Sequence, residues 1–574
     1  MPSFKVSGRR VSDRNIKSYN LKALEMNKII IACSCALLLF GGESCKKMLQ
    51  ENIVSGITEK YLDTKEGINA GLISVYSDCR NFYGSHKGLE MTELGTDIWT
   101  NASDGSNKYF NLYNTQLDAS EEWITTLWNN SYATINAINA VILHSDAVKN
   151  LSDAEKTEII AEARWLRAYN YFILVQTYGS VVLSLEETTT VSYEATRAPL
   201  GDLYDAMVSD LEFAIANLPA TQEDYGRATK PAAEDLLAKV LLRRAYTDVA
   251  KPDDFTRAAQ LAENVINNYD FHLLDDFADI FQQGAGEQNS EVIWAVQYTS
   301  NKLNNANNDT SAISYGLPNG NSLHLYFVMQ YDILPGMLRD VANGRPYREL
   351  RPTMFSLNNF YNRSVDSRYD KSFQTVWYCN NPNNIPVDGN GQPMFTVGDT
   401  AIWMPGYELN QTRRYMVISP SQYTETRFPV LTKFLDKTRP TRTETAGSRD
   451  YLALRLADTY LVASEALLGT GQPAAALDKL NAVRERAAYP GMEAQMRYDN
   501  INIDTVLNER ARELAGESTR FFDLTRTGKL VERVRMYNPQ AAPLIQDYHA
   551  LRPIPQSQIN LTTTPFAQNP GYPN

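Results

Sequence analysis

The sequence predicts a mainly α-helical protein in which paired helices form a scaffold and irregular insertions form a polar, aromatic-rich face. Three observations predict this class. Two Ala-rich stretches share one helix–break–helix layout, a long helix begins at a capping motif, and residues 285–447 carry loop signals instead of helical ones. A few short strands are expected only in the loop-rich segment.

A long helix is predicted to begin after Ser152. Ser152 and Glu155 have the spacing of a capping box, in which the serine caps the first turn and the glutamate reaches back to the cap. Apolar residues then recur at intervals of three and four, as they do on one face of a helix. Gly179 follows this pattern and is the expected end of the helix.

The two stretches that share a layout are residues 230–269 and 448–487. Each reads as a helix, a short break that contains proline, and a second Ala-rich helix. Their length is close to the ~34 residues of a tetratricopeptide (TPR) unit, although the full TPR signature is not matched. Such a pair cannot bury its apolar face alone, so the pairs are expected to stack. Residues 195–219 and 504–534 supply further helices.

Residues 285–447 are rich in Asn, Gly, Pro and Tyr. A loop region of this length inside a globular protein is usually functional. Within it, VDGNGQPMF at 387–395 predicts a hairpin turn. The segment is therefore expected to carry the ligand-facing surface of the helical scaffold.

An apolar run lies near the N-terminus, IIIACSCALLLF at residues 29–40, with Lys28 before it. A membrane-spanning helix needs ~20 apolar residues, whereas a signal-peptide core needs ~7–15. Two glycines and a serine then lead to Cys45, which predicts a bacterial lipoprotein signal over residues 1–44. The Cys45 thiol would be acylated and residues 45–60 would form a tether. The alternative is a buried helix with an incidental cysteine.

The start of the chain carries a second expectation. Met26 is followed by Asn and Lys28 and looks like a better signal-peptide start than Met1. Residues 1–25 are therefore read as an extension of the gene beyond its true start, or as a long polar region ahead of the apolar core.

Composition excludes some functions. The formal charge of −12 makes the chain a poor ligand for polyanions, so no nucleic-acid partner is expected. Outside the predicted signal and anchor only Cys79 and Cys379 remain, and a disulfide between them is possible but not implied. Without a CxxC motif or a Cys/His cluster, no zinc or other metal site is predicted.

No motif predicts catalysis. HExxH, GxSxG, Walker and GxGxxG patterns are absent from the sequence, and the five histidines are scattered singly. We therefore expect a protein that is not an enzyme and has no cofactor. A glycosidase stays open, because it needs only two carboxylates whose separation a sequence does not show. DGNG at 388–391 lacks the spacing of a calcium loop, so a structural calcium ion has no support.

Tyrosine is abundant, with 33 residues against 20 Phe and 7 Trp. Rings with a polar edge suit sugars, which offer apolar C–H faces and a rim of hydroxyl groups. The stretches 93–110, 378–384 and 401–415 have this makeup.

Three tryptophans lie among apolar neighbours at helical spacing and are assigned to the core: Trp123, Trp128 and Trp165. Arg164 and Arg167 are expected either to pair with acidic residues inside the scaffold or to be plain surface charges.

Five stretches in order resemble the SusD/RagB family of outer-membrane lipoproteins. They are AEARWLRAYNYFILVQTYGSVVL at 161–183, GRATKPAAEDLLAKVLLRRAY at 226–246, residues 451–487, LNERARELAGESTRFFDLTRTGKL at 507–530 and LRPIPQSQINLTTTPFAQNPGY at 551–572. The resemblance runs from Cys45 to the end of the chain. It implies about four TPR-like helix pairs in a single domain, residues 61–574. The helices would lie mainly in 61–270 and 448–535, with the ligand-face insertion at 285–447.

The resemblance also implies a function. Members of this family capture oligosaccharides at the cell surface of Bacteroidetes-type bacteria and deliver them to a SusC-like TonB-dependent outer-membrane transporter, without catalysis. Some take peptides instead, which is the alternative here. The implied location is the outer membrane, through the lipid anchor and facing the cell exterior. One departure is that Lys46 and Lys47 follow Cys45, where surface-exported relatives commonly carry acidic residues.

The resemblance implies a ligand site in the segment before the first helical repeats, ELGTDIWTNASD. Trp99 would stack on a sugar face, and Asp97 and Asn101 would bind hydroxyl groups. Tyr315 and Tyr326, from the later insertion, complete the predicted set of glycan-binding residues.

Overall fold

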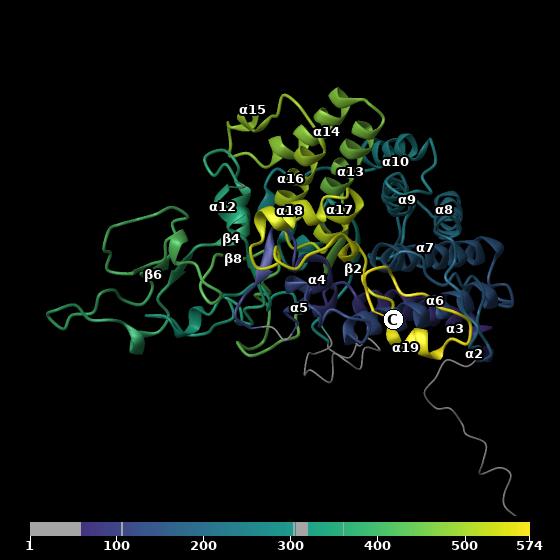
Figure 1. The fold of residues 1–574 in the computed structure, drawn as a ribbon, viewed down its shortest axis with the longest axis horizontal. Helices are drawn as coiled ribbons and strands as arrows, with labels where there is room; N and C mark the ends of the chain where they lie inside the picture. Colours follow the sequence, from purple (N-terminus) through teal and green to yellow (C-terminus); the bar gives the residue numbers. More distant parts are fainter. Residues whose placement is uncertain (1–58, 105–106, 302–304, 306–319, 360, 574) are drawn as a thin grey trace, which may run out of the picture. The chain divides into compact units, whose positions relative to one another are not determined.

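Helices dominate the computed structural model of the protein, which confirms the predicted mainly α-helical class (Figure 1). The structure describes residues 59–573 except 105–106, 302–304, 306–319 and 360. The predicted signal peptide, the anchor Cys45 and Tyr315 therefore lie outside the described residues. The chain from Glu59 onward forms one compact unit.

The helices fall into two groups along the chain. The first group comprises α2 (Glu59–Leu62), α3 (Lys65–Asp78), α4 (His86–Glu93), α5 (Tyr109–Leu112), α6 (Glu122–Ser145), α7 (Asp153–Tyr178), α8 (Leu200–Asn217), α9 (Lys230–Arg244) and α10 (Asp254–Asn268). The second comprises α13 (Leu456–Gly469), α14 (Pro473–Arg486), α15 (Glu493–Met496), α16 (Ile503–Glu513), α17 (Arg520–Arg526), α18 (Leu530–Tyr537) and α19 (Gln556–Leu561). Between the groups, α12 (Arg368–Ser372) lies among short strands and turns.

The long helices stack in chain order. Helix α3 packs against α6, and from α6 to α10 each helix packs against the next. Helix α10 then packs against α13, which in turn packs against α14 and α16. The two stretches with the shared layout, α9–α10 and α13–α14, are thus direct neighbours, as stacked helix pairs require.

Helix α7 begins and ends where the sequence predicts. The Ser152 side chain accepts a hydrogen bond from the Glu155 backbone N–H, and the Glu155 carboxylate accepts one from the Ser152 N–H. Gly179 ends the helix with a φ of +73°, which glycine adopts without strain. The three tryptophans assigned to the core are buried. Arg167 forms a buried two-point ion pair with Asp210 on α8, at 2.7 and 2.8 Å.

One predicted helix is partly a strand. Residues 451–455, read as the start of a helix, form β9 (Tyr451–Arg455), which pairs antiparallel with β2 (Val292–Val296). Both strands lie in the core, where cross-strand packing outweighs the modest helical preference of YLALR. This pairing attaches the beginning of the insertion to the helix pair that follows it.

One further short strand, β1 (Trp99–Asn101), lies between α4 and α5 and pairs with β3 (Leu350–Pro352) of the insertion. The other strands of the insertion are β4 (Phe373–Gln374) with β8 (Val430–Leu431), and a three-stranded sheet of β5 (Val376–Tyr378), β6 (Thr400–Trp403) and β7 (Met416–Val417). The predicted hairpin turn is present, because Val387 bridges to Pro393 and the Asp388 carboxylate accepts hydrogen bonds from the N–H groups of Asn390 and Gln392. Cys79 and Cys379 are buried free thiols, so they form no disulfide.

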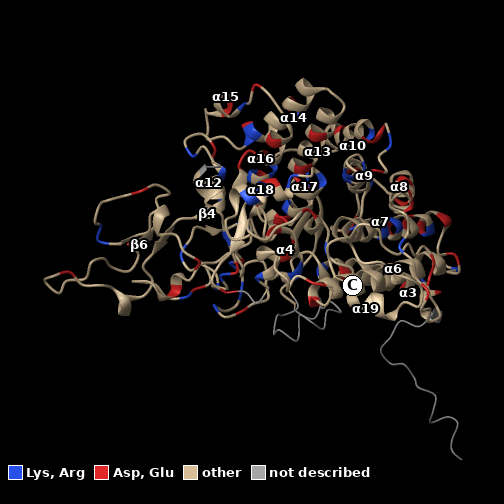
Figure 2. Ribbon diagram, in the orientation of Figure 1, with Lys and Arg blue, Asp and Glu red and all other residues tan. Residues whose placement is uncertain are grey.

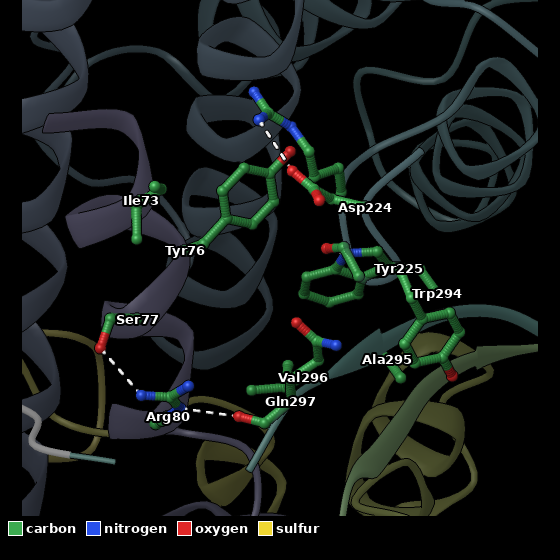
Figure 3. Close-up of a pocket in the computed structure, with 12 residues that line it drawn as sticks. Ile73, Tyr76, Ser77, Arg80, Asp224, Tyr225, Trp294, Ala295, Val296 and Gln297 are labelled. Carbon is green, nitrogen blue, oxygen red and sulfur yellow. Dashed lines mark hydrogen bonds and ion pairs between the residues drawn. The ribbon is translucent and has the colours of Figure 1, made fainter. Parts of the chain in front are cut away.

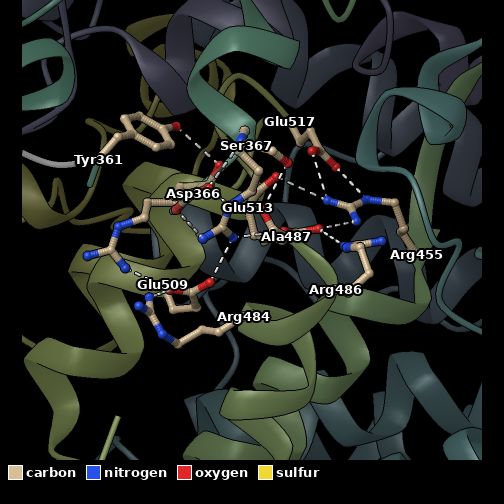
Figure 4. A network of polar contacts seen from close by, with 12 residues as sticks. Tyr361, Asp366, Ser367, Arg455, Arg484, Arg486, Ala487, Glu509, Glu513 and Glu517 are labelled. Carbon is tan, nitrogen blue, oxygen red and sulfur yellow. Dashed lines mark hydrogen bonds and ion pairs between the residues drawn. The ribbon is translucent and has the colours of Figure 1, made fainter. Parts of the chain in front are cut away.

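A buried ionic network joins the insertion to the helices (Figure 4). Arg368 of α12 is fully buried and contacts Glu509 at 2.7 Å and Glu513 at 3.0 Å, both on α16. Glu513 also binds Arg455 at 2.8 Å and pairs with Arg486. Figure 2 shows both basic and acidic residues along α16, α17 and α18. Within the stretch 507–530, Glu509, Glu513 and Arg520 are thus buried in ion pairs that join elements of the scaffold.

Candidate functional site

The structure corrects the predicted stacking residue, Trp99. Its side chain is 0% exposed in β1, and its ring packs against Phe327 with centroids 4.7 Å apart. A ring without exposed surface cannot stack on a sugar. Trp99 is therefore a core residue in this structure, and the prediction that it contacts ligand is wrong.

Asp97 and Asn101 are likewise engaged by the protein itself. The buried Asp97 carboxylate accepts hydrogen bonds from Arg520 at 2.8 and 2.6 Å and from Arg533 at 2.7 Å. Asn101 is buried and donates to the Lys108 carbonyl at 3.3 Å. Both side chains are buried and hydrogen-bonded within the protein, so both are corrected to structural roles. The sequence could not show this, because Arg520 lies 423 residues from Asp97.

Tyr326 is also buried. Its hydroxyl donates to the Ser322 hydroxyl at 2.8 Å, and its ring stacks on His86. It is part of the core and does not face solvent, so it too is corrected. Tyr315, the fifth predicted residue, lies outside the described residues.

A pocket of about 430 Å³ lies elsewhere, between α3, the α8–α9 loop and β2 (Figure 3). Its volume is within the ~300–1,000 Å³ of small-molecule sites. Helix α3 and the turn after it supply one wall, the loop a second and β2 the third. The lining residues are Ile73, Tyr76, Ser77, Arg80, Asp224, Tyr225, Gly226, Arg227, Trp294, Ala295, Val296 and Gln297.

Gly226 shapes the loop wall. Its φ of +90° is strained for any residue with a side chain, and a Cβ there would lie 2.8 Å from the Gln297 side chain. Its carbonyl accepts a hydrogen bond from the Trp294 indole at 2.8 Å. The glycine therefore lets the loop lie directly on β2 and brings Tyr225 and Arg227 to the pocket.

The back of the pocket is fixed by one buried carboxylate. Glu162 of α7 accepts hydrogen bonds from Arg227 at 2.7 and 3.0 Å and from the Tyr76 hydroxyl at 2.5 Å. The Tyr76 hydroxyl in turn accepts from the Ala228 N–H at 2.8 Å. Burial and the adjacent Glu162 raise the pKa of Tyr76 well above its usual value, so it stays a neutral donor. This network holds the Tyr76 ring and the Arg227 guanidinium in fixed positions.

The rim of the pocket is open to ligand. Asp224 and Gln297 are exposed, and Arg80 is half-buried beside them. Arg80 donates to the Gln297 carbonyl at 2.8 Å and to the Ser77 hydroxyl at 3.1 Å, which orients its guanidinium along the rim (Figure 3). The amide of Gln297 and the carboxylate of Asp224 can each bind hydroxyl groups.

The chemistry of the pocket is that of binding. Tyrosine rings provide apolar faces with polar edges, while Arg, Asp and Gln provide directed hydrogen bonds. Among the lining residues, Asp224 is the single carboxylate. Glycoside hydrolysis in most families needs two carboxyl groups, about 5–9.5 Å apart, so the lining lacks the usual acid–base pair.

A second aromatic surface lies on the β5–β6–β7 sheet. Trp403 contacts Tyr407 and Tyr415 edge-on, with centroids 6.1 and 6.5 Å apart. Tyr407 is 55% exposed, and Tyr378 on β5 is 61% exposed. These residues fall in the stretches 378–384 and 401–415, whose composition predicts a sugar-facing surface. The sequence, in contrast, did not indicate the pocket residues. Gly226 in the α8–α9 loop was the one local signal of the pocket.

Within the described residues, no helix has the length and apolar character needed to cross a membrane. A stacked-helix scaffold that carries a polar, aromatic pocket defines a class of helical binding protein. The chain belongs to the SusD family: the SusD family model matches residues 290–572, and a second model, described as starch-binding associating with outer membrane, matches residues 49–242.

Known relatives cover most of the chain. It is 24% identical over 568 residues to SusD-like protein P25 of Formosa agariphila, across 93% of this chain and 98% of the relative. It is 22% identical to starch-binding protein SusD of Bacteroides thetaiotaomicron, across 74% of this chain and 75% of that one. A solved laminarin-binding SusD-like protein has the same fold, with a TM-score of 0.65 and 23% identity over 89% of this chain and 100% of the other.

Proposed function

We infer that the protein is a non-catalytic glycan-binding lipoprotein of the outer membrane, which captures oligosaccharides and delivers them to a SusC-like TonB-dependent transporter. The observation that carries the proposal is the pocket, where Tyr76 and Tyr225 lie beside Arg80, Asp224 and Gln297. This set of rings and directed polar groups suits a sugar ring. Relatives described as starch-binding and laminarin-binding support the same ligand class.

The pocket is tested by calorimetry with oligosaccharides of starch and of laminarin. Tyr225→Ala removes one ring and Gln297→Ala one exposed amide. Losing the ring contact is expected to cost about 1.4 kcal/mol, or about tenfold in affinity. Tyr193→Ala is the matched control, because Tyr193 is 57% exposed but is not part of the pocket lining.

Other ligand classes give distinct outcomes in the same experiment. Binding of peptides in place of both glycans would replace the proposed ligand with the alternative one. Release of shorter sugars during incubation, detected by chromatography, would overturn the non-catalytic assignment. Unchanged affinity in both pocket variants would show that the glycan binds at another surface. The aromatic surface around Trp403 on the β5–β6–β7 sheet would be the first to test.

The membrane part of the proposal is tested separately. Cys45→Ala should abolish lipidation and release the protein from the outer-membrane fraction, because an unacylated chain has no anchor. Retention of the variant in the lipid-anchored fraction would refute the anchor. Co-purification of the full chain with a TonB-dependent transporter from detergent-solubilised outer membranes tests the partner.

A further inference from the structure

Three acid–base side chains converge at the start of α4. His86 and Glu90 lie one turn apart on the helix, and Glu349 comes from the segment just before β3. One ligand atom from each lies within 4.8 Å of the others. The spacing of His86 and Glu90 is visible in the sequence, but Glu349 lies 263 residues further along, so the group could not be predicted from a motif.

Both carboxylates approach the same imidazole nitrogen. His86 Nε2 is 3.1 Å from Glu90 Oε1 and is also in contact with Glu349 Oε2. A ring nitrogen carries at most one hydrogen, so it can serve only one of the two carboxylates well. Glu90 is 1% exposed, and its second oxygen, Oε2, is buried without a hydrogen-bond partner. The cluster of His86, Glu90 and Glu349 thus has more hydrogen-bond acceptors than donors.

In the described residues, Glu90 and Glu349 share His86 as their ion-pair partner. Two buried carboxylates and one imidazole would be balanced more completely by a divalent cation.

His144 provides an informative contrast. It also lies between two carboxylates, but Asp63 binds its Nδ1 at 2.7 Å and Glu187 approaches its Nε2 at 3.4 Å. Each carboxylate there has its own ring nitrogen, as ordinary hydrogen bonding requires. At His86 both carboxylates approach the same nitrogen, Nε2. Three ligand atoms that bind one metal ion converge in this way.

We propose that His86, Glu90 and Glu349 form a binding site for a divalent transition-metal ion of the Zn²⁺ type. Two ligands bonded to one zinc ion at about 2.0–2.2 Å lie about 3–3.5 Å apart, which matches the 3.1 Å between His86 Nε2 and Glu90 Oε1. Glu349 contacts His86 Nε2 directly, so its carboxylate would have to move outward to admit the ion. The imidazole favours Zn²⁺ over Ca²⁺ or Mg²⁺, which prefer oxygen ligands only.

The neighbouring rings hold the imidazole in place. Tyr326 stacks on His86 with centroids 4.1 Å apart and planes 6° from parallel, and Trp123 packs edge-on at 4.6 Å. The His86 side chain is 11% exposed, so the cluster is not fully closed to solvent. A metal here would fasten α4 to the start of β3, and so connect the scaffold to the insertion.

The test is metal binding by the purified full chain, freed of metal with a chelator and titrated with ZnCl₂ alone. We expect one Zn²⁺ per chain by elemental analysis and a rise in melting temperature. His86→Gln and Glu349→Gln should weaken Zn²⁺ binding by at least about a hundredfold, because each removes a ligand. His144→Gln is the matched control and should bind as the wild type does.

A second measurement does not depend on variants that fold. X-ray absorption of the Zn²⁺-loaded wild type should show one histidine nitrogen among oxygen ligands. The proposal is overturned if the wild type binds no Zn²⁺, if binding is equal in all three variants, or if the absorption spectrum shows no histidine ligand. Tighter binding of CaCl₂ than of ZnCl₂ would also overturn it.

Discussion

Arg520 binds both carboxylate oxygens of Asp97 in a buried ion pair, with distances of 2.8 Å to Oδ1 and 2.6 Å to Oδ2. Arg533 adds a third hydrogen bond to Oδ2 at 2.7 Å. Although burial alone would raise it, the two guanidinium groups lower the pKa of Asp97 to about 2. The segment after α4 is thereby joined to α17 and α18, which come from the far end of the chain.

Asp97→Asn should therefore destabilise the fold. It removes the negative charge and leaves the buried Arg520 guanidinium without a counter-ion, whereas Arg533 keeps its ion pair with Asp504. Breaking a buried ion pair from one side typically costs about 3–5 kcal/mol. Urea denaturation measures the change in the free energy of unfolding. The control is Asp104→Asn, because Asp104 pairs with Arg348 at the surface, where such a pair contributes about 0–1 kcal/mol. Equal losses in the two variants would contradict a structural role for Asp97.

The ionic network around Glu513 should make the protein acid-sensitive. Although burial acts against it, the adjacent Arg486, Arg455 and Arg368 lower the pKa of Glu513 from its usual 4.5 to about 2. A lowered folded-state pKa stabilises the fold at pH values above 4.5, and this stabilisation is lost as the pH falls from 4.5 toward 2.

The free energy of unfolding, measured from pH 6 to pH 2.5, should therefore fall steeply below pH 4.5. Glu513→Gln should be less stable at pH 6 and should show a shallower fall, because the titrating group is gone. A variant that keeps the wild-type slope would show that acid sensitivity arises from other carboxylates.

The fold was predictable because its signals are local. The capping box at Ser152, the glycine that ends α7 and the two Ala-rich pairs depend on neighbours three or four residues away. The burial of the predicted ligand residues could not be foreseen in this way. Asp97 and Asn101 have the composition of a sugar site, but Asp97 is bound by arginines more than 400 residues away. Short-range patterns cannot reveal such partners. For the same reason, the sequence did not indicate the pocket or the contact between Glu349 and His86.

Trp99→Ala should lower stability and leave glycan affinity unchanged in the folded protein. Trp99 is fully buried against Phe327, and truncating a buried Trp to Ala typically costs about 3–5 kcal/mol. Thermal unfolding and calorimetry separate the two effects. Tyr378→Ala is the control for losing an exposed aromatic side chain, and its stability should change by less than about 0.5 kcal/mol. Loss of affinity without loss of stability in Trp99→Ala would restore Trp99 to the ligand site.

Gly226→Ala should disturb the pocket from its backbone. The added Cβ would meet the Gln297 side chain at 2.8 Å, and a non-glycine residue at a φ of +90° is strained by about 1–3 kcal/mol. The loop would then lift from β2, separating Tyr225 from the rim and weakening the bond between the Trp294 indole and the Gly226 carbonyl. We expect a lower melting temperature and, if the pocket is the glycan site, a weaker affinity as well.

Gly389→Ala is the matched control, since a Cβ added there would have no atom within 4 Å and the φ of Gly389 is not in the left-handed region. A silent Gly226→Ala variant would mean that the loop does not depend on its glycine, whereas lower stability with unchanged affinity would place the glycan outside this pocket.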